Sequence, residues 1–199
     1  MLEDTFGIPI LKTRMPNHDI IKSEFSSFLT DEETFRDASS IWDCNCGTTH
    51  GKEDNSKLPW DTFFQNINPL ISQYAQAVGF NTEKYELFGY AWANRYTKGQ
   101  HQEIHAHEGD NNIISCAYML DLPDDDVDLG QFIFYNSAYR IFPADIHYMF
   151  EKKEHSKRYN PMLKDGDIVF FPSSLEHYVT YNKTDKIRAS ISANFGIAI

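Results

Sequence analysis

The sequence predicts a mainly β fold with supporting α-helices, in the form of a sandwich or jelly roll. After Gly79 the chain divides into short runs of apolar or alternating residues, which are typical of strands. Clusters of Gly, Pro, Asp and Asn separate these runs. Aromatic residues make up 15% of the chain, and Phe and Tyr, which dominate that set, favour the half-buried surface of a sheet.

The N-terminal part, residues 1–83, is expected to supply a strand and the supporting helices. The apolar run GIPIL at residues 7–11 predicts a strand. Residues 19–29 carry apolar side chains at helical spacing, with Asn17 as the expected N-cap. A stronger amphipathic helix is predicted over residues 59–78, because it opens on a proline and its apolar positions recur every three or four residues. Such a stripe is usually core packing, so this helix should support a sheet.

Residues 84–199 are expected to form the core of the jelly roll, within a single domain that spans residues 1–199. The predicted strands are YELFGYAWANRY, NIISCAYML, QFIFY, DIVFFP, EHYVTY and IRASISANFGIAI. Residues 38–58 show little periodicity and predict a long loop or irregular hairpin. Residues 136–164 also lack a clear period, so we expect an excursion beside one rim of the fold.

Charge and composition argue against several classes of function. The formal net charge of −11 would repel a phosphate backbone, so no nucleic-acid partner is expected. No segment approaches the roughly 18 apolar residues of a membrane span, and the N-terminus lacks the pattern of an export signal. Three cysteines in such a chain indicate a reduced, cytoplasmic setting without a disulfide framework. The sequence does not indicate an oligomeric state.

Three histidines form a candidate metal site. His105 and His107 are two residues apart before a strand-like run, so both imidazoles project from one face of an extended chain. His177 follows the apolar strand DIVFFP and should begin the return strand. A jelly roll can bring such distant strands together, and imidazoles that leave coordination positions open suit non-haem iron. The alternative is that some of these histidines are merely polar residues near strand ends.

The last predicted strand has one face for a core and one for a site. Apolar residues alternate with polar ones over residues 187–195, which places Arg188 and Ser190 on the same polar face. The rigid fork of donors on Arg188 suits bidentate binding of a carboxylate deep in a cleft. Ser190 could donate to the same carboxylate. The other polar residues on this face are Ser192 and Asn194.

Over residues 92–195 the chain resembles the iron(II)- and 2-oxoglutarate-dependent oxygenases, particularly the prolyl-hydroxylase-like branch. In that family a His-x-Asp pair precedes a strand, a second His comes late, and an Arg-x-Ser or similar motif anchors the distal carboxylate of the co-substrate. The resemblance implies a double-stranded β-helix that uses iron(II), 2-oxoglutarate and O2. It also implies His105, His107 and His177 as metal ligands, and Arg188 and Ser190 as co-substrate contacts.

Two tyrosines are further co-substrate candidates through the same resemblance. The family places a tyrosine on the strand before the first ligand, which points to Tyr96, and Tyr118 is a second candidate. Both are equally compatible with core aromatics, because strands are enriched in tyrosine.

The acid position of the family motif is occupied by His107 in this chain. Either three neutral imidazoles bind the metal, or a nearby acid serves in its place. The acids within reach are Asp110, Glu108 and Glu103, the last as part of an alternative pair with His101. We prefer His105 and His107, which lie at the expected distance before the strand CAYML.

The implied activity is hydroxylation of an unactivated carbon, and the substrate is expected to be a small molecule or a peptide of unknown identity. A cupin-type dioxygenase or isomerase is the alternative enzyme class, because Gly99 and the His105–His107 pair match the first cupin motif and Gly166 with His177 match the second. Cupins, however, do not account for Arg188. A non-catalytic jelly-roll binding or structural module is the third possibility.

Two weaker motifs do not support further sites. Cys44, Cys46 and His50 resemble half of a zinc knuckle, but the local sequence offers no fourth ligand. The acidic run over residues 121–128 lacks the central glycine and terminal glutamate of a calcium loop, so a solvated turn is expected there.

Overall fold

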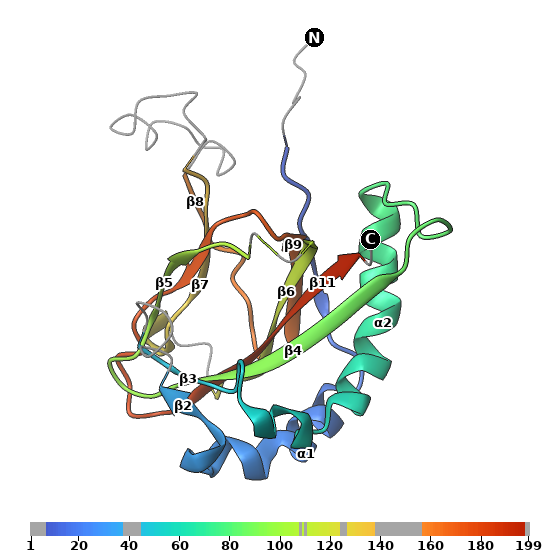
Figure 1. Cartoon of the computed structure of the whole chain (residues 1–199). Helices are drawn as coiled ribbons and strands as arrows, with labels where there is room; N and C mark the ends of the chain where they lie inside the picture. Colours follow the sequence, from blue (N-terminus) through green and yellow to red (C-terminus); the bar gives the residue numbers. More distant parts are fainter. Residues whose placement is uncertain are drawn as a thin grey trace.

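Two β-sheets pack face to face, and two α-helices cover the outer face of the larger one (Figure 1). The computed structural model describes residues 7–37, 45–107, 109, 111–123, 127–137 and 157–197. All strand pairs within these residues are antiparallel. The predicted mainly β jelly roll with supporting helices is therefore confirmed.

The larger sheet has the strand order β1-β9-β6-β11-β4-β3-β2. Its strands are β1 (Leu11–Arg14), β2 (Arg36–Asp37), β3 (Gly47–Thr48), β4 (Leu87–Tyr96), β6 (Asn112–Asp121), β9 (Asp167–Pro172) and β11 (Arg188–Ile197). The last strand, β11, lies at the centre and pairs with β4 along its whole length. Its other edge pairs with β6. The C-terminal strand is thus held from both sides, and its side chains have fixed directions.

The smaller sheet has the order β5-β10-β7-β8 and forms the opposite wall. Its strands are β5 (Gln102–His105), β7 (Phe132–Tyr135), β8 (Arg158–Tyr159) and β10 (His177–Val179). The predicted return strand at His177 is confirmed as β10. Three short 3-10 helices complete the described elements, namely η1 (Glu32–Thr34), η3 (Glu53–Lys57) and η4 (Val127–Leu129).

Both predicted helices are present. Helix α1 (His18–Thr30) begins after Asn17, but that residue has a left-handed backbone with φ of 51° and its side chain makes no capping hydrogen bond. The side-chain amide of Asn17 instead donates to Asn66 of α2. The stronger helix is α2 (Trp60–Ala77), with Pro59 at the N-cap position. As the periodicity indicated, its buried stripe packs on the sheet.

Alternation along the strands separates two cores. The core between the larger sheet and the helices is built from α1 and α2 together with outward residues of the strands, among them Ile191, Ala193 and Phe195 of β11. The core between the two sheets includes Tyr96, Met119 and Phe134. Because β11 shows Ala189, Ile191 and Ala193 to the helices, its polar residues face the space between the sheets.

Three predicted segments differ in detail from the structure. The strand expected at residues 7–11 lies at Leu11–Arg14, where it pairs with β9. The loop expected at 38–58 contains β3 and η3 in its described part, and residues 38–44 lie outside the described residues. Residues 138–156 of the expected excursion also lie outside them. Among the described residues, no helix combines the length and apolar character needed to cross a membrane.

Candidate metal centre

The three predicted histidines meet between the two sheets. His105 at the end of β5 and His177 at the start of β10 are direct partners in the antiparallel register. Their ring centroids lie 4.3 Å apart. His107 lies just beyond β5, where its backbone N–H donates to the carbonyl of Ser173 at 2.9 Å. Sheet pairing and this backbone hydrogen bond therefore hold all three residues in place.

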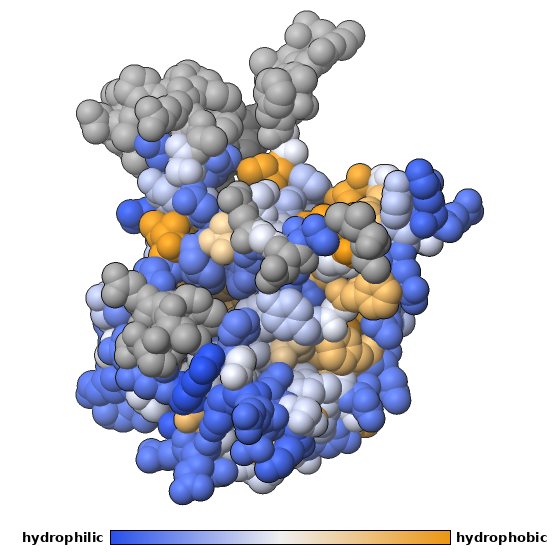
Figure 2. Space-filling view, viewed as in Figure 1, coloured by the Kyte–Doolittle hydropathy of each residue, from blue (hydrophilic) through white to orange (hydrophobic). Residues whose placement is uncertain are grey.

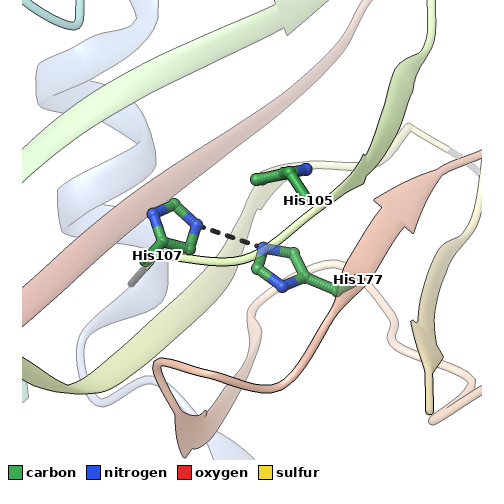
Figure 3. A group of neighbouring side chains, drawn as sticks. All are labelled: His105, His107 and His177. Carbon is green, nitrogen blue, oxygen red and sulfur yellow. Dashed lines mark hydrogen bonds between the residues drawn. The ribbon is translucent and has the colours of Figure 1, made fainter. Parts of the chain in front are cut away.

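Nitrogens of the His107 and His177 rings face one another, and the His105 ring lies beside them (Figure 3). One ligand atom from each of the three residues lies within 4.8 Å of the other two, and the Nε2 atoms of His107 and His177 are 3.2 Å apart. Three imidazole nitrogens at this spacing can surround a single transition-metal ion, and they leave the remaining coordination positions open. Within the described part of the chain, this is the only group of three or more His, Cys, Asp or Glu residues with that geometry.

Backbone carbonyls fix two of the rings. Nδ1 of His105 lies 2.8 Å from the carbonyl oxygen of Glu103, and Nδ1 of His177 lies 2.9 Å from that of Leu175. A carbonyl only accepts hydrogen bonds, so each Nδ1 carries the proton of the neutral ring. The Nε2 lone pairs of His105 and His177 are then available to a metal.

Burial keeps the three imidazoles neutral. Burial, together with the neighbouring His105 and His50, lowers the pKa of His107 to about 3. Burial also moves the pKa of His177 well below its ordinary value, with His105 and His107 adding to the shift. The pKa of His105 is lowered by burial too. Only a neutral imidazole binds a metal, so the cluster is ready for a cation at neutral pH.

Arg188 lies in the same space between the sheets and is only 1% exposed. Its guanidinium carbon lies 4.7 Å from the centre of the Tyr96 ring, and Nη2 lies 3.4 Å from Sδ of Met119. Nε and Nη1 are buried and have no hydrogen-bond partner, and no described carboxylate pairs with the guanidinium. Burial accordingly lowers the pKa of Arg188 from its ordinary value. An uncompensated buried charge is expensive, so this guanidinium is suited to an anionic ligand.

Tyr96 and Ser190, two other predicted co-substrate contacts, share the face of the larger sheet that carries Arg188. Tyr96 is the register partner of Arg188, and its hydroxyl lies 2.9 Å from Oε1 of Gln102. Ser190 is buried, two residues along β11 from Arg188 and thus on the same face. Both are therefore in reach of one ligand.

Tyr118 is not part of this group. It lies on the helix side of the larger sheet, in the core with Phe63, and its hydroxyl is 2.6 Å from Nδ1 of His18. Adjacent residues of β6 point to opposite faces, and Met119 is the one that reaches Arg188. The prediction of Tyr118 as a co-substrate contact is corrected by this strand parity.

Of the acids considered in place of His107, only Glu103 lies among the described residues, and it does not join the cluster. The Glu103 carboxylate is outside the group of converging ligand atoms, and its Oε2 is buried without a hydrogen-bond partner. Glu108 and Asp110 lie outside the described residues. Cys44 of the rejected zinc motif lies outside them as well, and Cys46 is buried between the sheets.

Two side chains near the cluster had no role in the sequence-based prediction. The Trp92 ring lies 5.6 Å from that of His107 and 4.9 Å from that of His50, and its Nε1 is buried without a partner. Asn194 was placed on the polar face of its strand, and its Nδ2 lies 3.1 Å from Nδ1 of His107. No local sequence pattern indicates these contacts.

A groove elsewhere on the molecule is separate from the histidines. It has a volume of about 480 Å3 and lies between α2 and the ends of β4 and β11, with Phe64, Ile71, Leu87 and Phe195 in its lining. Phe195 belongs to the helix-side core. Figure 2 shows hydrophobic side chains near the place where α2 meets β4 and β11. The lower part of the same view is hydrophilic.

A jelly roll with three neutral imidazoles and a buried unpaired arginine between its sheets has the features of a non-haem metal oxygenase that binds an acidic co-substrate. The comparison with protein families agrees with this class. Residues 90–194 match the model 2OG-FeII_Oxy_5 of the 2OG-Fe(II) oxygenases. The chain belongs to this family, whose members use iron(II), 2-oxoglutarate and O2.

Solved structures share the fold at low sequence identity. A prolyl-4-hydroxylase of Pseudomonas putida superposes with a TM-score of 0.66 at 13% identity, over 95% of this chain and 92% of that one. EvdO2 of Micromonospora carbonacea var. aurantiaca, complexed with 2-oxoglutarate, gives 0.61 at 14% identity over 96% and 87%. The α-ketoglutarate-dependent carbocyclase SnoK of nogalamycin biosynthesis gives 0.62 at 14% identity over 95% and 79%. Among curated proteins, no sequence matches this chain.

Proposed function

We propose that this oxygenase hydroxylates an unactivated carbon of a small-molecule or peptidyl substrate, with iron(II) held by His105, His107 and His177. The convergence of the three imidazoles supports this ligand set. When bound, iron(II) with 2-oxoglutarate and O2 supplies an oxidant for a C–H bond, while 2-oxoglutarate is converted to succinate and CO2. The protein contributes the position of each reactant.

The single observation that carries the proposal is the unpaired guanidinium of Arg188. Burial of an ion destabilises the folded state by roughly several kcal/mol, even after relaxation, unless a partner compensates the charge. The distal carboxylate of 2-oxoglutarate would supply the missing charge and accept from Nε and Nη1, both of which lack partners. Tyr96, beneath the guanidinium, and Ser190, on the same strand face, would complete this end of the binding site.

The choice of hydroxylation rests on one of the similar solved structures. One similar structure is a prolyl-4-hydroxylase, which favours a hydroxylation. Others are the carbocyclase SnoK and the epimerase SnoN, so the same scaffold serves other outcomes. Substrate choice would fall to groups around the histidines, among them Trp92, whose ring centroid lies 5.6 Å from that of His107.

The test compares two oxo acids that differ only at the distal end. Binding of 2-oxoglutarate and of 2-oxopentanoate, which has a methyl group there, is measured calorimetrically with the manganese(II)-loaded full chain and with Arg188→Met. The wild type should prefer 2-oxoglutarate, and Arg188→Met should bind the two acids alike. Equal binding by the wild type would contradict the proposal. Arg95→Met is the matched control, because Arg95 lies next to Tyr96 on β4 and contacts Phe35 in the helix-side core.

Turnover separates the alternatives. Oxygen-dependent succinate release that needs iron(II) and Arg188 supports a 2-oxoglutarate oxygenase. A cupin-type enzyme would bind the metal without preference for 2-oxoglutarate, and a binding module would release no succinate even with substrate extracts present.

A further inference from the structure

The three histidines differ in what holds their second ring nitrogen. Backbone carbonyls hold His105 and His177. His107 alone relies on a side chain, because its Nδ1 lies 3.1 Å from Nδ2 of Asn194. Asn194 is 2% exposed, so water does not readily replace it. Groups that hold the second nitrogen of a ligand histidine set its tautomer and orientation.

The orientation of the Asn194 amide decides which nitrogen of His107 carries the proton. With Nδ2 toward the ring, Nδ1 accepts the hydrogen bond, so the proton is on Nε2, which faces Nε2 of His177. For His107 to bind a metal through Nε2, the proton must move to Nδ1, and Nδ1–H then needs an acceptor. The carbonyl oxygen Oδ1 of Asn194 provides one if the amide turns over.

The surroundings of Asn194 accept either orientation. Oδ1 receives a hydrogen bond from the Ser115 hydroxyl at 2.8 Å, and Nδ2 lies 3.1 Å from the Tyr90 hydroxyl. Ser115 in turn shares a hydrogen bond with the Ser173 hydroxyl at 2.9 Å. Hydroxyls both donate and accept, so each can reverse its role when the amide turns. The turn therefore leaves no buried polar group without a partner, which would otherwise be expensive.

We propose that Asn194 is the positioning residue of His107, with Oδ1 receiving the Nδ1–H of the metal-binding tautomer and thereby setting the affinity of the site for a divalent cation. The inference rests on the three-histidine metal site of the proposed function. It adds a residue outside the ligand set whose amide couples the tautomer of one ligand to a chain of hydroxyls on β4, β6 and the segment after β9.

Cobalt(II) affinity of the full chain, measured by calorimetry, tests the proposal. Asn194→Leu keeps the size of the side chain and removes the acceptor, and it should weaken binding by about 10- to 100-fold. Asn194→Asp keeps an acceptor and should bind nearly as well as the wild type. Wild-type affinity in Asn194→Leu would overturn the proposal.

Asn94→Leu is the matched control. Asn94 is 1% exposed on the neighbouring strand and bonds to the hydroxyls of Thr48 and Ser192, as Asn194 does to its hydroxyls. It touches none of the three ligand histidines through a hydrogen bond in the described structure. Its replacement should leave the cobalt(II) affinity unchanged. An equal loss in both leucine variants would show a purely structural effect and overturn the positioning role.

A tautomer measurement needs no variant and therefore decides even if Asn194→Leu does not fold. In long-range 1H–15N spectra of the zinc-loaded chain, Nδ1 of His107 should be protonated and Nε2 metal-bound. Metal binding through Nδ1 would overturn the proposal. His107→Ala separates the two claims. If His107→Ala retains the wild-type metal affinity, the three-histidine site itself is wrong. If His107→Ala loses affinity while Asn194→Leu keeps it, only the role of Asn194 is refuted.

Discussion

The Nε2 atoms of His107 and His177 lie 3.2 Å apart, although 70 positions separate the residues in the sequence. Two nitrogen lone pairs repel one another at this distance, so a proton or a cation must lie between them. Both imidazoles have lowered pKa values because they are buried, which disfavours an extra proton. In the neutral pair the Nε2–H of His107 fills this gap by donating to Nε2 of His177, and a divalent metal can take the place of that proton once it has moved to Nδ1.

Removal of a ligand should abolish tight metal binding. His105→Ala and His177→Ala should each weaken cobalt(II) binding by at least about 100-fold, since loss of even an outer partner typically costs 10- to 100-fold. His101→Ala is the control, because this histidine stacks on Tyr181 at 4.2 Å and lies outside the cluster. Calorimetric titration checks the series. If only His101→Ala weakened cobalt(II) binding, the metal site would not lie at the three histidines.

Replacement of His107 by the acid of the family motif should preserve the site. His107→Asp should bind cobalt(II) as tightly as the wild type or more tightly, because a carboxylate adds attraction for a divalent cation. His107→Ala should bind it far less well. If the alanine variant keeps full affinity, the third ligand is elsewhere, and Glu108 or Asp110 becomes the candidate.

Arg188 should lower the free energy of unfolding of the ligand-free protein while it supports 2-oxoglutarate binding. Without 2-oxoglutarate, Arg188→Met should have a free energy of unfolding equal to that of the wild type or up to about 4 kcal/mol higher, since a buried charge gives way to an apolar chain of similar length. Added 2-oxoglutarate with manganese(II) should stabilise the wild type but not the variant. Urea unfolding measures both effects, and marked destabilisation of the variant without ligand would contradict them.

The two tyrosines should behave differently. Tyr118→Phe removes the hydrogen bond to buried His18 and should lower the free energy of unfolding by about 1 to 3 kcal/mol. It should leave 2-oxoglutarate affinity unchanged because Tyr118 lies on the helix side. Tyr96→Phe should weaken 2-oxoglutarate binding. The reverse pattern in unfolding and binding measurements would refute the assignment of faces.

Acid should destabilise the chain through its buried imidazoles. The pKa of His107 is about 3 in the folded protein and 6.5 without burial, so between these values the unfolded state binds more protons. Stability should therefore be constant above about pH 7 and fall as the pH drops below 6.5, by up to about 1.4 kcal/mol per pH unit for each such histidine. In EDTA, His107→Gln should show a shallower fall in urea unfolding. Identical slopes would contradict the shift.

Strand alternation made the last strand predictable. In β11 small apolar residues alternate with Arg188, Ser190, Ser192 and Asn194, so the polar face could be identified without a structure. The spacing of His105 and His107 likewise indicated a shared site, and the structure brings both to His177. These features are local, so the sequence alone contains them.

The face of Tyr118 could not be predicted because β6 is buried on both sides. Its run NIISCAYML is almost continuously apolar, and such a run has no period that distinguishes the two faces. The contacts of Tyr118 with His18, and of Asn194 with His107, join residues about 90 to 100 positions apart. Only the pairing of the strands determines which side chains meet at such separations.

The most direct test of the account is a crystal structure of the chain exposed to iron(II) and 2-oxoglutarate without oxygen. We predict iron on Nε2 of His105, His107 and His177, with the distal carboxylate of 2-oxoglutarate on Nε and Nη1 of Arg188. Iron bound by Glu108 or Asp110 in place of His107, or 2-oxoglutarate bound away from Arg188, would contradict it.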